Sequence, residues 1–162
     1  MTTVAVLVDP PRPGLVLDEL AETAPLSAGE AAELYSAMCR DVCRAVEASG
    51  GELLVNYRPE ESLPDEFAGE ESAEAEVRAM VRPALESPDE ARFETQVGET
   101  FAGRVGNTVT HLLDQEGVAT AAAIEPTAAF LARQVVDNAA MKLRRHDVVL
   151  GPATGGRVYY AG

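Results

Sequence analysis

The chain has 162 residues, enough for one domain with a substantial core, and its 46% hydrophobic and 25% charged residues are typical of a soluble globular protein. Twenty-seven acidic side chains against 13 basic ones give a formal net charge of −14. This balance argues against nucleic acid and anionic membranes as partners, because binding to phosphate-rich surfaces requires a basic patch.

The basic residues are almost all arginine, since Lys142 is the single lysine among them. An acid-rich, lysine-poor surface fits a cytosol of very high salt, in which dense charge is screened and stays hydrated. An ordinary acidic protein encoded by a GC-rich genome would show the same composition. Both interpretations remain open at this point.

The cysteines and the first residues favour a cytoplasmic protein. Residues 1–3 carry no basic charge, and the apolar run after them is too short for a signal peptide or a membrane span. Cys39 and Cys43 lie four residues apart on a predicted helix, a spacing that suits a disulfide poorly, so we expect them to be reduced core residues. These cysteines and two distant histidines give no zinc-ligand spacing, and we expect no metal site.

The first predicted element is a strand at residues 4–8, whose five apolar residues indicate burial on both faces of a parallel sheet. The loop from Asp9 to Gly14 should be rigid, because each of its prolines fixes its own φ angle, and Gly14 then allows the chain to turn. In open α/β sheets, ligands bind beyond the carboxyl ends of such strands. This loop is therefore the first candidate binding site.

A βαβ unit follows. Residues 15–20 predict a short helix or turn, and Ser27 with Glu30 forms the Ser-x-x-Glu pattern of a capping box. The helix that starts there should end before Gly50, because two adjacent glycines stop it. Residues 52–58 then predict a second strand, parallel to the first.

The middle of the chain is acidic and irregular. Residues 59–76 predict a surface loop whose carboxylates form a hydrated face rather than a cation site. A short helix interrupted at Pro83 and a strand at residues 92–96 follow. Residues 98–113 predict a helix in which Gly103 and Gly106 flank Arg104, which indicates either close backbone approach at a ligand or merely loose packing.

The last third continues the alternation of strands and helices. Residues 117–124 predict a buried strand, and Pro126 should be the first residue of the next helix. Strands are expected at residues 148–150 and 158–160. The apolar face of that helix should consist of Ala128, Leu131, Val135, Ala139 and Leu143. The pattern predicts an α/β fold, a three-layer sandwich with a mainly parallel sheet, in a single domain over residues 1–162.

Familiar catalytic motifs are missing from the sequence. There is no Gly-x-Gly-x-x-Gly after the first strand, no Walker-type Gly-Lys-Ser/Thr and no nucleophile elbow, and His111 and His146 lie in helical contexts that favour structural roles. The two loops that follow strands are the most site-like features, because prolines and glycines give a preorganised backbone that can approach a ligand. The candidate binding residues in these loops are Asp9, Pro13, Gly14, Gly151, Pro152, Gly155 and Gly156.

The order of the segments resembles one known family: GT-A-fold transferases associated with radical-SAM or selenium-related domains, relatives of nucleotide-diphospho-sugar transferases. The segments that carry the resemblance are Pro11 to Gly14, Ala32 to Tyr35, Gln96 to Gly98 with Arg104, Pro126, His146 to Ala153, Gly155-Gly156 and Tyr159-Tyr160. The resemblance implies a GT-A, Rossmann-like fold, a nucleotide or nucleotide-sugar ligand and, from the acidic composition, a haloarchaeal member. The sequence ends directly after a predicted strand with no helix to cover it, as the front portion of a longer domain would, and whether a C-terminal portion is missing stays open.

Three departures from the family pattern affect function. Residues 17–20 read Leu-Asp-Glu-Leu where the family has a Lys-Thr-Arg-Leu type segment, and the acidic residues would repel a diphosphate. Ile124 replaces the aspartate that holds a divalent metal, with Glu125 beside it, and Thr154 replaces the aspartate of an Asp-Gly-Gly motif. Metal-assisted transfer requires such oxygen ligands.

The resemblance and its departures together leave two hypotheses. The first is a non-catalytic binding or scaffolding protein, acting in a homo-oligomer or with a protein partner. The second is an active transferase or nucleotidyltransferase with a rearranged site, distantly like the phospholactate guanylyltransferases, using Mg²⁺ or Mn²⁺. For that reaction the candidate catalytic residues are Glu125 and Arg104, with Asp9 as a further polar group.

The halophilic interpretation predicts that lowering the salt concentration unfolds the protein, because unscreened repulsion between its carboxylates then destabilises the compact state. Circular dichroism across a series of KCl concentrations measures this. A helical signal and a melting temperature that are indifferent to salt would leave only the compositional explanation.

Overall fold

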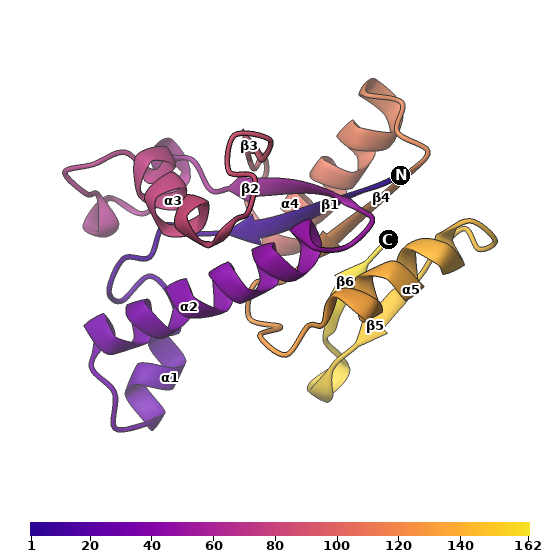
Figure 1. Ribbon diagram of the computed structural model, residues 1–162. Coiled ribbons are helices and arrows are strands. Elements are labelled where there is room, and N and C mark those ends of the chain that lie inside the picture. The colour runs from indigo at the N-terminus through magenta and orange to yellow at the C-terminus, as the bar shows by residue number, and fades with distance from the viewer.

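The central feature of the computed structural model, which describes residues 1–162, is one six-stranded sheet in the order β3-β2-β1-β4-β6-β5 (Figure 1). The neighbours β1–β2, β1–β4 and β2–β3 are parallel, whereas β6 runs antiparallel to both β4 and β5. The strands are β1 (Thr2–Val8), β2 (Glu52–Tyr57), β3 (Arg92–Thr95), β4 (Thr120–Ile124), β5 (Leu150–Pro152) and β6 (Val158–Ala161). The expected mainly parallel sheet is confirmed.

Helices cover both faces of this sheet, as Figure 1 shows. Because side chains alternate along a strand, Val4 and Val6 of β1 face a larger core with helices α2, α3 and α5, while Ala5 and Leu7 face a smaller core under α4. The helices are α1 (Asp18–Thr23), α2 (Ala28–Glu47), α3 (Ala73–Val81), α4 (Phe101–Thr110) and α5 (Arg133–Leu143). A π-helical turn, His111–Gln115, continues α4. The three-layer sandwich is confirmed.

The βαβ unit at the start of the chain forms as its local signals predict. All seven residues of β1 are buried, and the Ser27–Glu30 capping box closes the first turn of α2 through both of its hydrogen bonds. Cys39 and Cys43 are free thiols in the larger core. No helix is both long and apolar enough to cross a membrane.

The acidic segment after β2 is tied to the loop after β1 by Arg12, whose side chain is buried. Its guanidinium binds both carboxylate oxygens of Glu60 and one of Glu76, each at 2.7 Å. It also donates to the carbonyls of Phe67 and Glu71 at 2.7 and 3.0 Å. Part of the predicted hydrated face is therefore an internal counterion cluster.

The predicted helix start at Pro126 is wrong. Residues 125–132 form turns closed by bonds from Ala128 N–H to the Glu125 carbonyl and from Leu131 N–H to the Ala128 carbonyl, and α5 begins only at Arg133. The later start also changes the buried face: Val136 is buried, while Val135 is 38% exposed. A proline can begin a helix, but the hydrogen bonds here each join residues three apart. They close separate turns, and the bonds between residues four apart that define an α-helix do not start.

The strand expected at residues 148–150 is displaced along the chain. Strand β5 begins at Leu150, and Val148 lies outside it and is 64% exposed. Val149 lies just before β5 and makes two backbone hydrogen bonds with Gly162, one in each direction and each 2.9 Å long. The apolar run thus lies at the edge of the sheet and not in a buried strand.

Replacing Glu60 with Gln should destabilise the protein at neutral pH and have progressively less effect in acid. The bond to Arg12 lowers the pKa of Glu60 from 4.5 to about 2, so its carboxylate stabilises the fold above the unfolded-state value, and that contribution is lost as pH falls toward 2. Urea unfolding of both proteins at several pH values measures the difference. A difference that persists unchanged at pH about 2 would contradict this assignment.

Candidate functional site

The carboxyl edge of the sheet collects the segments expected to bind a ligand. Strands β1 to β4 are parallel, so the residues that follow them, including Asp9, Arg58 and Glu125, emerge at the same edge. The β5–β6 hairpin returns there as well, since the Glu125 N–H donates to the carbonyl of Tyr159 at 3.0 Å. The structure thus brings the loop after β1 and the residue after β4 to one edge.

Asp9 is the first side chain of this edge, directly after β1. Its backbone N–H donates to the hydroxyl of Tyr35 on α2 at 2.9 Å, which fixes the start of the loop. Burial raises the pKa of the Asp9 carboxyl, while the charges of Arg58 and Arg104 act in the opposite direction. Asp9 forms no ion pair within 4.0 Å with either arginine. The three charged groups share this region without neutralising one another directly.

Arg104 of α4 is a buried cation with spare hydrogen-bonding capacity. The residue is 8% exposed, and its Nη1 donates to the Glu99 carbonyl at 3.0 Å while its buried Nε has no partner. Burial and the nearby positive charge of Arg58 both lower the pKa of Arg104. A buried charged donor without a partner is costly. An anion that accepts this donor would relieve that cost.

Arg58, the residue after β2, adds a second guanidinium. Its Nη2 donates to the Ser62 carbonyl at 3.0 Å, and its Nε is buried without a partner, like that of Arg104. Sequence reasoning missed Arg58. Its position directly after a buried parallel strand was the available signal, since such positions line ligand sites in open α/β sheets.

Gly98 and Gln96 shape the segment between β3 and α4, which precedes Arg104. Gly98 has a φ angle of +130°, and a Cβ there would lie 3.1 Å from the backbone nitrogen of Arg104, so glycine is favoured at this position. The buried Gln96 amide donates to the carbonyls of Val8 and Asn56 at 3.1 and 2.8 Å, which ties the end of β3 to β1 and β2. By contrast, a Cβ on Gly106 would meet nothing within 4 Å, and a Cβ on Gly103 would meet only the capping hydroxyl of Thr100. The close backbone approach is thus at Gly98.

Glu125 borders a different cavity on the α4 side of this edge. The cavity holds about 310 Å³ and is lined by apolar residues with Glu125 and Arg157 as its charged members. Ile124 lies just before Glu125 and is 1% exposed, so it packs in the core and offers no ligand atom. Glu125 is the single carboxylate at the end of β4.

The remaining predicted binding residues are spread over the edge. A Cβ on Gly14 would lie 3.2 Å from the ring of Phe67, which packs over the Asp9–Gly14 loop beside the exposed Pro13. Gly151 is needed for packing, because a Cβ there would lie 2.6 Å from Tyr159. Pro152, Gly155 and Gly156 are exposed at the β5–β6 end of the sheet, separated from β1 by β4 and β6. Ligand binding by these loops stays a prediction.

Comparison with known proteins supports the fold. No protein-family model and no curated protein matches the chain. Among solved structures, the chain is similar to the crystal structure of a candidate nucleotide-diphospho-sugar transferase from Desulfovibrio desulfuricans G20, with a TM-score of 0.79 and 21% identity over 99% of this chain. The chain spans 62% of the length of that protein. The likeness confirms the expected α/β fold of nucleotide-diphospho-sugar transferases.

Proposed function

We propose that this chain binds the diphosphate of a nucleotide or nucleotide sugar at the carboxyl edge of its sheet, and that it does so as a binding protein without metal-dependent transfer. The observation that carries the proposal is the buried guanidinium of Arg104, whose Nε has no hydrogen-bond partner. The nearby guanidinium of Arg58 also has a buried Nε without a partner. Guanidinium groups match phosphate oxygens in geometry and in charge.

The local charge supports an anionic ligand. Two arginines and one carboxylate, Asp9, leave a local positive excess in a chain whose net charge is −14. Arg58, directly after β2, and Arg104 of α4 would therefore replace the phosphate-binding cations that residues 17–20 lack. Asp18 and Glu19, which replace those cations, are exposed in α1.

The residues present do not fit the divalent cation that the fold implies. Mg²⁺ and Mn²⁺ prefer several oxygen ligands, whereas the end of β4 offers the buried aliphatic side chain of Ile124 and one half-buried carboxylate, Glu125. Thr154 is exposed in the hairpin loop and provides only a hydroxyl. This donor set favours binding over transfer.

One observation favours the alternative of an active transferase. Glu125 and Arg157 face the same cavity of about 310 Å³, next to the Ile124 position at which the family places its metal ligand. A carboxylate and a cation in one cavity provide a base and a stabiliser for a leaving group. Glu125 is the residue whose replacement tests this activity.

Replacing Arg104 with Gln should weaken diphosphate binding by about tenfold or more, since a charged hydrogen bond to phosphate contributes at least about 1.4 kcal/mol. Calorimetric titration with UDP, GDP and their sugar conjugates, with and without Mn²⁺, measures this. Arg58→Gln should act similarly. Arg145→Gln, which changes an exposed arginine beyond α5, is the matched control and should bind like the unmodified chain.

The same titrations separate the two functions. Binding that is independent of Mn²⁺ and lost in Arg104→Gln supports the binding protein. Mn²⁺-dependent release of nucleoside diphosphate, abolished by Glu125→Gln, would instead establish the transferase. If no nucleotide binds, both fail.

Replacing Asp9 with Asn should both stabilise the protein at neutral pH and tighten diphosphate binding. Burial raises the pKa of Asp9, so ionising it costs folding free energy above that pKa, and the cost vanishes below the unfolded-state value of 3.8. The stabilisation should therefore disappear as pH falls through the raised pKa. Urea unfolding measures it, with the exposed Asp41→Asn as the control. A destabilised Asp9→Asn protein at pH about 7 would contradict the charge assignment.

A further inference from the structure

The end of α4 brings two potential metal ligands onto one side of the helix. Residues five apart on an α-helix point about 140° away from each other. The π-helical turn at His111–Gln115 reduces this offset, because the Glu116 N–H bonds to the His111 carbonyl at 3.2 Å and closes a five-residue turn. His111 Nε2 consequently lies 3.5 Å from a carboxylate oxygen of Glu116.

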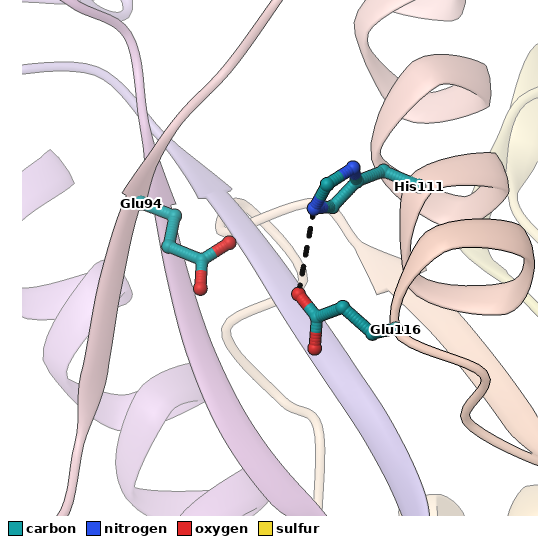
Figure 2. Close-up of side chains that lie close together, drawn as sticks. All are labelled: Glu94, His111 and Glu116. Atoms are coloured by element: carbon teal, nitrogen blue, oxygen red, sulfur yellow. Dashed lines mark ion pairs between the residues drawn. The ribbon is translucent and has the colours of Figure 1, made fainter.

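Strand β3 supplies a third group from the opposite side. Figure 2 shows the Glu94 side chain extending from β3 toward His111 and Glu116. One ligand atom from each of the three residues lies within 4.8 Å of the other two. Glu94 is fixed at its backbone, because its carbonyl accepts a bond from the Asn56 side chain at 3.1 Å.

Arg92 is the cation that the carboxylates of Glu94 and Glu116 share in this structure. Its guanidinium bonds to Glu94, to Glu116 at 2.8 Å and to Glu52 at 3.3 Å. Three carboxylates around one guanidinium leave an excess of negative charge. Glu52 is not one of the three potential metal ligands, so it would keep Arg92 paired if a metal ion occupied Glu94 and Glu116.

We propose that Glu94, His111 and Glu116 bind a divalent transition-metal ion such as Zn²⁺. One imidazole nitrogen and two carboxylate oxygens suit Zn²⁺, Mn²⁺ or Fe²⁺, whereas Mg²⁺ and Ca²⁺ take oxygen ligands. The histidine distinguishes this site from a plain cluster of carboxylates around an arginine, because an imidazole nitrogen is a common ligand of transition metals. Three protein ligands leave coordination positions open for water or an anion.

A polar cavity adjoins this site. It holds about 700 Å³, and both Glu94 and His111 line it. Asn56, Asn107 and Thr108 add amide and hydroxyl groups to the same wall. A bound metal would border this cavity, so its open positions could meet a ligand held there. The site uses none of the residues assigned to diphosphate binding and stands independently of that proposal.

Calorimetric titration of the full chain with ZnCl₂ at neutral pH should show one saturable site. His111→Ala should weaken Zn²⁺ binding by about tenfold or more, and Glu116→Gln and Glu94→Gln should also weaken it. The matched control is His146→Ala, which removes the other exposed histidine and should bind Zn²⁺ unchanged. Arg92→Gln should tighten binding, because it frees both carboxylates from the competing guanidinium.

A second readout uses Co²⁺ in place of Zn²⁺. Its visible absorption should change on addition of the unmodified chain and of His146→Ala, and should not change with His111→Ala. The buried Cys39 and Cys43 do not compete in the folded protein. Equal Zn²⁺ affinity of His111→Ala and His146→Ala, or no saturable Zn²⁺ binding by the unmodified chain, would overturn the proposal. Circular dichroism confirms that each variant is folded.

Discussion

The Arg12 guanidinium is the interaction on which the arrangement of the carboxyl edge depends. It makes five hydrogen bonds, to Glu60, Glu76 and two backbone carbonyls, and so joins the loop after β1 to the segment after β2 and to α3. Glu60 extends the cluster by accepting from the Ala73 N–H at the start of α3. Gly69 is required beside it, because a Cβ there would lie 2.9 Å from the Arg12 guanidinium carbon. These contacts fix the loop that begins at Asp9.

Arg12 and Arg104 show how the same side chain serves structure in one place and leaves room for a ligand in another. Both are buried, but Arg12 makes five bonds to carboxylates and carbonyls, whereas Arg104 makes one bond, to the Glu99 carbonyl, and leaves its Nε without a partner. Buried donors are normally satisfied, so the exception calls for an explanation. The proposed diphosphate would supply one, because its oxygens would accept from both Arg104 and Arg58.

Local sequence signals predicted the sheet and most helices. The apolar run of β1 and the capping box at Ser27 fix their elements through short-range chemistry, and both form as expected. The start of α5 was wrong because a proline permits a helix start without requiring one. Arg104 was predicted as a site residue, but Arg58 and the Glu94–His111–Glu116 cluster were not. The position of Arg58 after a buried strand was a usable signal, whereas the cluster comes together only through strand order and a π-helical turn, neither of which can be derived from residue spacing.

Helix α4 unites the two proposed sites. Its apolar residues Val105 and Val109, with Leu112 of the following turn, pack on the smaller core. Arg104 and His111 are seven residues apart, close to two helical turns, so they share another side of the helix. Asn107 and Thr108 lie between them and line the cavity beside β3, and the Thr108 hydroxyl bonds to Asn56 at 2.8 Å. This polar stripe carries Arg104 near one end and His111 at the other, while Asn107 and Thr108 between them bond to the Val97 carbonyl and to Asn56. The middle of the stripe is thus satisfied within the protein. Its two ends are where the proposed diphosphate and metal ion would bind.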